Sequence, residues 1–177
     1  MASRTSGAPT GLLTSAHYTL RLARPEDREL LFSIYAGTRA EELAGVAWTP
    51  AQKDAFLRQQ FAAQDAHYRA HYEGASFYVI DAAAAAAGRL YVARWPREIR
   101  IMDIALLPAH RRRGLGTAVL ADLLAEGDTT VKRVTIHVER HNPALGLYQR
   151  LGFQPAADRG VYLFLERRPH ASGGEEV

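Results

Sequence analysis

The sequence predicts a single α/β domain in which a mixed sheet is packed against helices. Segments with the alternation of strands and segments with the periodicity of amphipathic helices follow one another, in the order strand, two helices, three strands, helix, strand, helix, strand. The chain has 177 residues, enough for one hydrophobic core, and shows no internal repeat. Its composition, 47% hydrophobic and 23% charged, is typical of a globular protein.

The first part of the chain contains one strand and two helices. Residues 18–23 alternate and predict the strand. The segment 24–43 opens with a proline and acidic residues, which suit a first helical turn, and continues with apolar residues at helical spacing. Thr49 and Pro50 are a good N-cap and first residue for a second helix over residues 51–72.

Three strands are expected next. Residues 76–80, 88–95 and 99–107 are rich in β-branched and aromatic residues and are joined by short connections. The alanine-rich segment 81–88 has helical propensity, but it is short and lies between two strong strand signals. We therefore interpret it as a loose hairpin loop.

Helices and strands alternate in the last part of the chain. Apolar residues at helical spacing mark two helices, and β-rich runs mark two strands. In order, these are a helix from Gly114 to about Glu126, a strand over 131–139, a helix that starts at Asn142 and Pro143 and is closed by Gly152, and a strand over 160–167.

The predicted domain occupies residues 17–168. Residues 1–16 are rich in Ser, Thr, Gly and Ala and lack the apolar core of a secretory signal, so we expect a flexible arm; residues 169–177 should form a disordered tail. The chain has no cysteine, which excludes disulfides and thiolate zinc sites and fits a reducing compartment. No apolar run is long enough to span a bilayer. We expect a cytoplasmic protein without metal or membrane contact.

Basic charge is concentrated around one stretch of the sequence. The formal net charge is only +3, yet the range 89–113 contains seven arginines against Glu98 and Asp103. Within it, "RRRGLG" (111–116) leads from a strand into a helix. Such a turn presents unpaired backbone N–H groups at the positive end of a helix dipole, which suits a phosphate. Glycines let the ligand approach the backbone closely.

Two separated segments resemble motifs of the GCN5-related N-acetyltransferase (GNAT) superfamily. Residues 104–116 resemble motif A, whose loop pattern Arg/Gln-x-x-Gly-x-Gly/Ala is matched by Arg111, Gly114 and Gly116. Residues 142–153 resemble motif B, and the order of elements over about residues 18–166 agrees. The resemblance implies a mostly antiparallel sheet, flanked by about four helices and splayed at the cofactor site between the strands 99–107 and 131–139.

The resemblance also implies acetyl-CoA, or another short acyl-CoA, as the cofactor. Backbone groups of Ile104, Ala105 and Leu106 would bind the pantetheine arm. The pyrophosphate would be held by the loop and helix start: Arg111, Arg112, Arg113, Gly114, Leu115, Gly116 and Thr117. Asn142 matches an asparagine near the cofactor, although it is equally suited to cap the helix that follows. A short basic cluster without interleaved aromatic residues is not typical of nucleic-acid binding.

Amine acetylation needs a polarised thioester, a proton for the leaving thiolate and a neutral amine. Tyr148 matches the family tyrosine that protonates the sulfur, with core packing beside Leu147 and Leu151 as its structural alternative. The backbone N–H of Leu106 is the candidate oxyanion donor. His137 is the first candidate for the base; the alternatives are Asp103, Glu139 and water.

The acceptor cannot be identified from the sequence. Glu41, Glu42 and Trp48 could cover a cationic amine, or they could be a solvated helix end and a core indole. The resemblance implies an acetyl-CoA-dependent N-acetyltransferase in which a primary amine of a small molecule, a peptide N-terminus or a lysine attacks the thioester directly. The alternative is a catalytically silent acyl-CoA-binding sensor or interaction module. The sequence does not decide whether the protein forms a homodimer.

Overall fold

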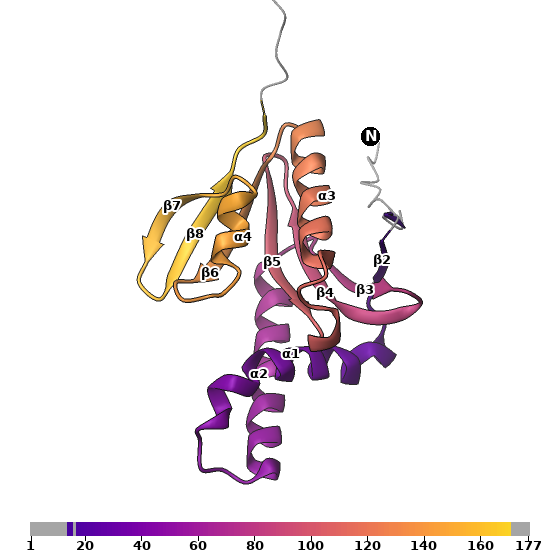
Figure 1. The fold of residues 1–177 in the computed structure, drawn as a ribbon, viewed down its shortest axis with the longest axis vertical. Helices are drawn as coiled ribbons and strands as arrows, with labels where there is room; N and C mark the ends of the chain where they lie inside the picture. Colours follow the sequence, from indigo (N-terminus) through magenta and orange to yellow (C-terminus); the bar gives the residue numbers. More distant parts are fainter. Residues whose placement is uncertain (1–13, 16, 171–177) are drawn as a thin grey trace, which may run out of the picture.

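The structure, a computed structural model, describes residues 14–15 and 17–170. It is an α/β fold in which one sheet of eight strands runs through the molecule (Figure 1). The strand order is β1-β2-β3-β4-β5-β6-β8-β7, and among these neighbours only β5 and β6 run parallel. The mixed, mostly antiparallel sheet with four flanking α-helices is confirmed for the described residues.

The elements follow the expected order, with two additional strands. The strands are β1 (Thr14–Ser15), β2 (Tyr18–Leu22), β3 (Ser76–Ala82), β4 (Ala85–Arg94), β5 (Glu98–Leu106), β6 (Arg133–Glu139), β7 (Gln154–Arg159) and β8 (Tyr162–Arg167). The helices are α1 (Arg28–Ala44), α2 (Pro50–His71), α3 (Leu115–Thr129) and α4 (Leu145–Arg150), with short 3-10 turns at Pro25–Asp27 and Pro108–His110.

A separate hydrophobic core lies on each face of the sheet. Because successive strand residues point to opposite faces, Val79 and Tyr91 join the core under α1 and α2, whereas Ile80 and Leu90 join the core under α3 and α4. The expected stripe on α3 is buried in the second core: Val119, Leu120, Leu123 and Leu124. None of the helices that the structure describes has the length and apolar character of a membrane span.

The helical pair α1 and α2 begins and packs as its sequence indicates. Thr49 Oγ1 accepts the Gln52 N–H at 3.2 Å, and Gln52 Oε1 accepts the Thr49 N–H at 2.9 Å, which forms a capping box at the start of α2. Phe61 of α2 is buried, with its ring centroid 5.8 Å from that of Phe32 and 5.7 Å from that of Tyr35, both on α1. These rings attach α2 to the rest of the molecule.

The alanine-rich hairpin is tighter than expected. In place of a loose loop over 81–88, β3 and β4 continue to a two-residue turn at Ala83 and Ala84, whose φ angles are 51° and 61°. Positive φ at both turn residues matches the twist of a two-residue hairpin. Alanine has low strand propensity, but pairing with β2 on one side and β5 on the other keeps these residues extended.

Helix α3 continues beyond the expected end at about Glu126, and Gly127 is a packing residue within it. It lies inside the helix, where an added Cβ would come within 2.8 Å of Val134 Cγ2 on β6. The helix therefore continues past Glu126 to Thr129, and β6 begins at Arg133. The glycine allows the end of α3 to lie close against β6.

Two strands were missed by the sequence analysis. The segment of β7 has no β-branched or aromatic residue, but as an edge strand it tolerates Pro155. Strand β1 lies inside the expected flexible arm 1–16 and pairs with β2. The rest of that arm, like residues 171–177 of the expected tail, lies outside the described residues. The His170 N–H donates to Asp128 Oδ1 at 2.7 Å and attaches the start of the tail to α3.

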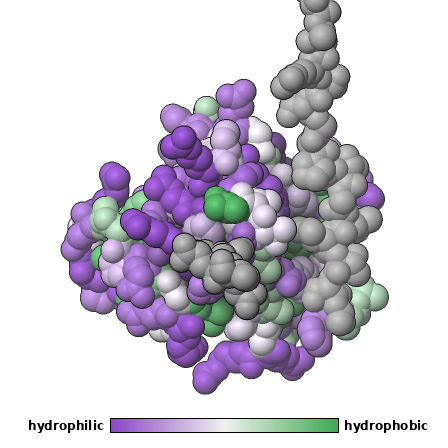
Figure 2. All heavy atoms as spheres, turned by 90° about the horizontal axis from the view of Figure 1, so that it is seen from above, coloured by the Kyte–Doolittle hydropathy of each residue, from purple (hydrophilic) through white to green (hydrophobic). Residues whose placement is uncertain are grey.

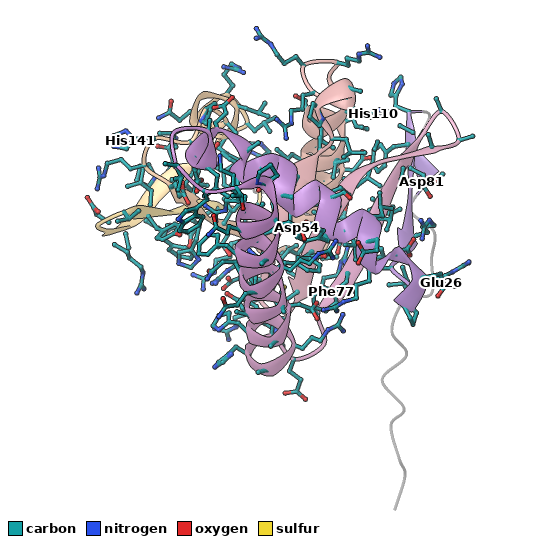
Figure 3. All side chains as sticks on the ribbon, turned by 90° about the horizontal axis from the view of Figure 1, so that it is seen from below. Glu26, Asp54, Phe77, Asp81, His110 and His141 are labelled. Atoms are coloured by element: carbon teal, nitrogen blue, oxygen red, sulfur yellow. The ribbon has the colours of Figure 1, made fainter. Side chains whose placement is uncertain are left out.

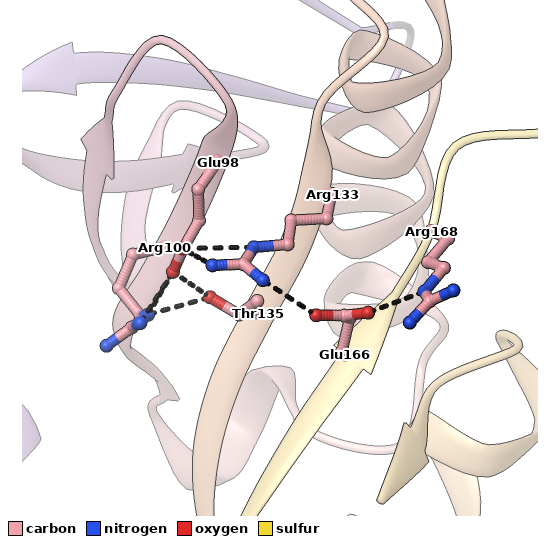
Figure 4. A network of polar contacts seen from close by, with 6 residues as sticks. All are labelled: Glu98, Arg100, Arg133, Thr135, Glu166 and Arg168. Atoms are coloured by element: carbon pink, nitrogen blue, oxygen red, sulfur yellow. Dashed lines mark hydrogen bonds and ion pairs between the residues drawn. The ribbon is translucent and has the colours of Figure 1, made fainter. Parts of the chain in front are cut away.

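A polar network closes the sheet where β5 and β6 begin (Figure 4). Glu98 is 7% exposed and accepts hydrogen bonds from Thr135 Oγ1 at 2.6 Å, Arg133 Nη2 at 2.7 Å and Arg100 Nε at 2.8 Å. Burial opposes the charge of Glu98, but these bonds hold its pKa below the ordinary value. Seen from this end, the surface is mainly hydrophilic (Figure 2). The network fixes β5 to β6 at this end only.

Candidate active site

A cleft opens where β5 and β6 separate. Their parallel pairing ends at Ile101 and Ile136, yet both strands continue, β5 to Leu106 and β6 to Glu139, and they diverge (Figure 1). The cleft encloses about 270 Å³ and is lined by residues of α1, α2, β4, β5 and β6 and by Tyr148 of α4. This is the splayed sheet that the family resemblance implies.

The backbone of β5 faces the cleft at alternate residues. The Leu107 N–H donates to the Ala87 carbonyl at 2.8 Å, which marks a hydrogen-bonded pair of the β4–β5 ladder. Because bonded and non-bonded pairs alternate in an antiparallel ladder, Ile104 and Leu106 occupy non-bonded positions and Ala105 a bonded one. The N–H and C=O groups of Ile104 and Leu106 therefore point away from β4, toward the cleft, whereas those of Ala105 serve the ladder.

The loop after β5 ends at an uncapped helix N-terminus. Gly114 precedes α3 with a φ of 81°, and no side chain accepts a hydrogen bond from the first turn. The free amides of that turn belong to Leu115, Gly116 and Thr117. Arg111, Arg112 and Arg113 are exposed beside them. Arg111 Nε donates to the Leu106 carbonyl at 2.8 Å, so this arginine attaches the loop to β5.

The arginines of 89–113 contribute less free charge than their number suggests. Three of the seven form ion pairs elsewhere in the fold: Arg89 with Asp103, Arg94 with Glu126, and Arg100 with Glu98. Two of these acids, Glu98 and Asp103, lie within the same stretch, whereas Glu126 comes from α3. The exposed positive charge at the loop is that of residues 111–113.

Tyr148 is held rigidly between α4 and the segment that follows it. Gly152, with a φ of 88°, turns the chain so that the Phe153 N–H donates to the Tyr148 carbonyl at 3.0 Å. The two rings meet edge to face, with centroids 5.6 Å apart. Tyr148 is 4% exposed; burial raises the pKa of its phenol well above the ordinary value, and the charge of Asp103 adds to this. The phenol therefore keeps its proton at neutral pH.

Asn142 serves as a cap and also lines the cleft. Its Oδ1 accepts the Ala144 N–H at 2.8 Å, and its carbonyl accepts the Leu145 N–H at 3.0 Å. The residue thus shapes the turn before α4, although the helix itself begins at Leu145 and not directly after Asn142. The capping role and a place beside the cleft occur together.

The three candidate bases all line the cleft, in different environments. His137 on β6 is exposed with its ring against Phe164, and desolvation lowers its pKa, as do the nearby charges of Arg100 and Arg159. Asp103 and Glu139 each lie next to an arginine: Asp103 Oδ2 is 2.5 Å from Arg89 Nη2, and Glu139 Oε1 is 3.7 Å from Arg39 Nη1. His137 is the one of the three that can be a neutral base at pH 7.

The sequence matches the model of a known family. Residues 34–153 match the acetyltransferase (GNAT) family. The chain belongs to this family. Both motif segments of the GNAT chain contribute residues to the cleft: Ile104 and Ala105 come from 104–116, and Asn142 and Tyr148 from 142–153.

Solved structures with the same fold include several acetyltransferases. The PaiA N-acetyltransferase of Thermoplasma acidophilum, crystallised with coenzyme A, is 15% identical, with a TM-score of 0.63 over 85% of this chain and 98% of that one. An acetyltransferase of Thermus thermophilus is 21% identical, with a TM-score of 0.63 over 86% and 97%. RimL, a ribosomal L7/L12 alpha-N-protein acetyltransferase, is 17% identical, with a TM-score of 0.63 over 94% and 98%. No curated protein sequence matches the chain significantly.

One wall of the GNAT cleft comes from residues of which the sequence analysis singled out only Glu42. Helix α1 contributes a stripe at spacings of three and four, namely Tyr35, Thr38, Arg39 and Glu42, and α2 contributes Gln64 and Tyr68. Figure 3 shows α1 and α2 in front of the sheet on this side. Of the expected acceptor residues only Glu42 lines the cleft; Trp48 is 42% exposed and packs against Phe56, so it is not a core indole.

Proposed function

We propose that this GNAT protein is an acetyl-CoA-dependent N-acetyltransferase in which a primary amine attacks the thioester directly. One observation carries the proposal: the cleft between β5 and β6 is lined both by Ile104, whose backbone N–H and C=O groups are not used by β4, and by Tyr148, whose phenol is protonated. A site for acyl transfer needs both a donor for the carbonyl oxygen and an acid for the leaving group.

The residues around the cleft fit an acyl-CoA. A pantetheine arm can continue the ladder of β5 through Ile104, because its N–H and C=O groups are not used by β4. The uncapped amides at the start of α3, together with the exposed arginines of the loop, suit the pyrophosphate. An added Cβ at Gly114 would meet nothing within 4 Å, so the approach to these amides is open.

Three groups of the chain would act on the reacting atoms. Acetyl-CoA supplies the acetyl group as a thioester. The Leu106 N–H is not used by β4 and would donate to the carbonyl oxygen as negative charge develops there. Tyr148 would give its proton to the departing sulfur. His137, neutral because its pKa is lowered, would accept a proton from the amine, directly or through water.

The proposal is tested by the release of free CoA thiol from acetyl-CoA in a screen of primary amines. We expect release that depends on the amine, on both acetyl-CoA and enzyme concentration, and on Tyr148. Small amines, peptides with free N-termini and lysine-containing peptides are all included, because acceptors of each kind are compatible with the fold. Binding of CoA without amine-dependent release by any of them would favour a silent acyl-CoA sensor instead.

A further inference from the structure

A buried ion pair lies at the floor of the cleft, on the side covered by α1 and α2. Arg89 of β4 is 1% exposed, and its Nη2 lies 2.5 Å from Asp103 Oδ2 on β5. The same Nη2 donates to Gln64 Oε1 of α2 at 3.0 Å. The guanidinium also lies over the rings of Tyr91 and Tyr35, at 4.8 and 5.6 Å from their centroids. The Asp103 carboxylate, the Gln64 amide and the two tyrosine rings therefore hold the Arg89 side chain in place.

The hydrogen bonding of this ion pair is incomplete. In the part of the chain that the structure describes, the buried side-chain polar atoms without a hydrogen-bond partner are Arg89 Nε, Arg89 Nη1 and Asp103 Oδ2. Asp103 lies close enough for an ion pair, but Nε and Nη1 of the buried guanidinium have no acceptor. Burying two charges costs desolvation energy that only good geometry offsets. Buried polar groups without partners are rare in folded proteins, so this pair in a cleft calls for an explanation.

The arginine orients the carboxylate toward the cleft. Oδ2 of Asp103 is buried against Arg89, while the side chain as a whole is 21% exposed. Its accessible part is therefore on the side of Oδ1, which accepts no hydrogen bond from the described residues. The aromatic rings of Tyr35 and Tyr68 line the same part of the cleft. A carboxylate oxygen beside aromatic rings is a favourable environment for an ammonium group.

The charge balance of the cleft also favours a cation. Its lining contains three carboxylates, Glu42, Asp103 and Glu139, and two guanidinium groups, Arg39 and Arg89. Arg39 donates to Glu42 at 2.8 Å and lies 3.7 Å from Glu139, so both arginines are already next to acids. A carboxylate on the acceptor would meet excess negative charge, since each guanidinium group already lies beside an acid. An ammonium group would find Asp103.

We propose that Asp103 binds the ammonium group of the acceptor and that Arg89 is the positioning residue that orients it. The acceptor is then a primary alkyl amine, protonated in solution, with no carboxylate on the carbon that bears the nitrogen. This assignment rests on the proposed function and adds to it the substrate class and the residue that selects it. An α-amino acid would be rejected by the same site.

A matched pair of amines tests the substrate class. Butylamine and norvaline differ only in the carboxylate on the amine-bearing carbon. For the wild-type protein we expect kcat/KM for butylamine to exceed that for norvaline by about tenfold or more. In Asp103→Asn, which keeps the shape of the side chain, kcat/KM for butylamine should fall about 10- to 100-fold, mainly through KM, while KM for acetyl-CoA changes less than about twofold. Asp54→Asn, which removes an exposed carboxylate of α2 (Figure 3), is the control and should behave as wild type.

Several outcomes would overturn the proposal. A kcat/KM of Asp103→Asn within about twofold of wild type would do so, as would a preference for norvaline. If neither amine is acetylated, the thermal stability of the CoA-bound protein is measured with added butylamine. A rise in Tm for the wild type that is lost in Asp103→Asn would support the ammonium site although the proposed function fails. No rise in the wild type would overturn the ammonium site, whereas a lack of CoA binding would overturn the proposed function.

Two further variants separate charge recognition from folding. Asp103→Asn leaves the Arg89 charge buried without its partner and can destabilise the fold. The double variant Arg89→Met/Asp103→Asn removes both charges; it should bind CoA normally and still show the raised KM for butylamine. With Asp103 present, Arg89→Lys should retain more kcat/KM than Arg89→Met, because a cation beneath Oδ2 is kept. Equal loss in both would remove the positioning role.

Discussion

Tyr148 is buried, and burial raises the pKa of its phenol. The turn that follows α4 holds the residue in this position. The Phe153 N–H holds the Tyr148 carbonyl, and the Phe153 ring packs on the phenol. Within the described residues the Tyr148 hydroxyl makes no hydrogen bond, although it lies in the wall of a cleft. A rigid donor without a partner is pre-organised for a ligand atom, because no existing bond has to break first.

Removing only the Tyr148 hydroxyl tests this role. In Tyr148→Phe the ring still packs on Phe153, so the fold should be retained. If the hydroxyl is the general acid, kcat should fall by roughly 10²–10⁴-fold. Affinity for acetyl-CoA should change little, because the expected phosphate contacts are on α3. Steady-state and single-turnover rates are both measured, since a slow product release would hide the chemical step. A single-turnover rate equal to that of wild type would make Tyr148 a packing residue.

Val131 is a residue in a conformation that its side chain disfavours. It follows α3 with a φ of 53° and is 76% exposed. The Lys132 N–H donates to the Gly127 carbonyl at 2.8 Å and the Val131 N–H to the Asp128 carbonyl at 3.3 Å, which is the pattern of a Schellman motif. Glycine is the usual residue at this position, and a β-branched residue there is strained.

We expect Val131→Gly to stabilise the protein. Relief of the left-handed conformation is worth about 1 kcal/mol, which corresponds to a rise in Tm of about 2–4 °C for a domain of this size. Val161→Gly is the matched control, since Val161 is also exposed, at 69%, but does not have a positive φ. It should lower the Tm or leave it unchanged. An unchanged Tm in Val131→Gly would show that the αL conformation costs nothing here.

The two glycines of the loop 111–116, Gly114 and Gly116, have different roles. Gly114 has a φ of 81° and open space around it, so only its backbone conformation requires glycine. Gly116 lies in the first turn of α3, where an added Cβ would be 3.6 Å from Leu106 Cδ1, an ordinary contact. The fold can therefore accept a side chain at Gly116, whereas a phosphate beside its amide cannot.

Gly116→Val should accordingly impair the cofactor and not the fold. We expect KM for acetyl-CoA to rise by about tenfold or more, because the side chain covers the amides of the helix start. Gly114→Val should instead lower the free energy of unfolding by about 1–2 kcal/mol through the left-handed backbone. Thermal melts and acetyl-CoA titrations of both variants separate the two effects. A normal KM in folded Gly116→Val would place the phosphates elsewhere.

The element order could be read from local patterns, and the exceptions have identifiable causes. Strand and helix periodicity located six of the eight strands and all four helices, because each buries one face. The helix predicted to end at about Glu126 continues to Thr129, because Gly127 allows it to pack against Val134 of β6, a contact that local periodicity does not contain. The turn at Ala83 and Ala84 and the edge strand β7 have weak intrinsic signals and depend on their neighbours in the sheet.

The sequence allowed a prediction of those parts of the site that consist of backbone groups or lie in a local motif. The loop 111–116 and Tyr148 stand in recognisable segments; Tyr148 lines the cleft, and the loop follows β5, one of the strands that form it. The wall formed by α1 and α2 was not predictable, because it depends on how those helices lie across the sheet. The same holds for Arg89, whose charge was counted with the basic cluster and is buried against Asp103.

At the scale of the whole molecule, the sheet is closed at one end and open at the other. The Glu98 network joins β5 to β6 where they begin (Figure 4), and no pairing joins them after Ile101 and Ile136. Segments from different parts of the sequence meet at the open end: the end of β5, the start of α3, and helix α4. A ligand in the cleft would therefore connect the two halves of the sheet and add contacts that the protein alone lacks.

Coenzyme A should for this reason stabilise the whole fold. A ligand that binds only the native state adds RT ln(1 + [L]/Kd) to the free energy of unfolding, about 2.7 kcal/mol at a concentration of 100 Kd. For a domain of this size, each kcal/mol corresponds to a Tm increase of about 2–4 °C. We therefore expect a concentration-dependent rise of several degrees with CoA or acetyl-CoA, measured by thermal denaturation.

Two comparisons locate the origin of that stabilisation. Pantetheine, which lacks the nucleotide and the pyrophosphate, can reach β5 but not the amides of α3, and should raise the Tm less than CoA does at equal concentration. In Gly116→Val the advantage of CoA over pantetheine should disappear, because the side chain covers those amides. Equal shifts with both compounds in wild type would mean that the loop 111–116 does not bind the pyrophosphate. No shift with CoA up to about millimolar concentration would remove the acyl-CoA assignment, since mass action requires one.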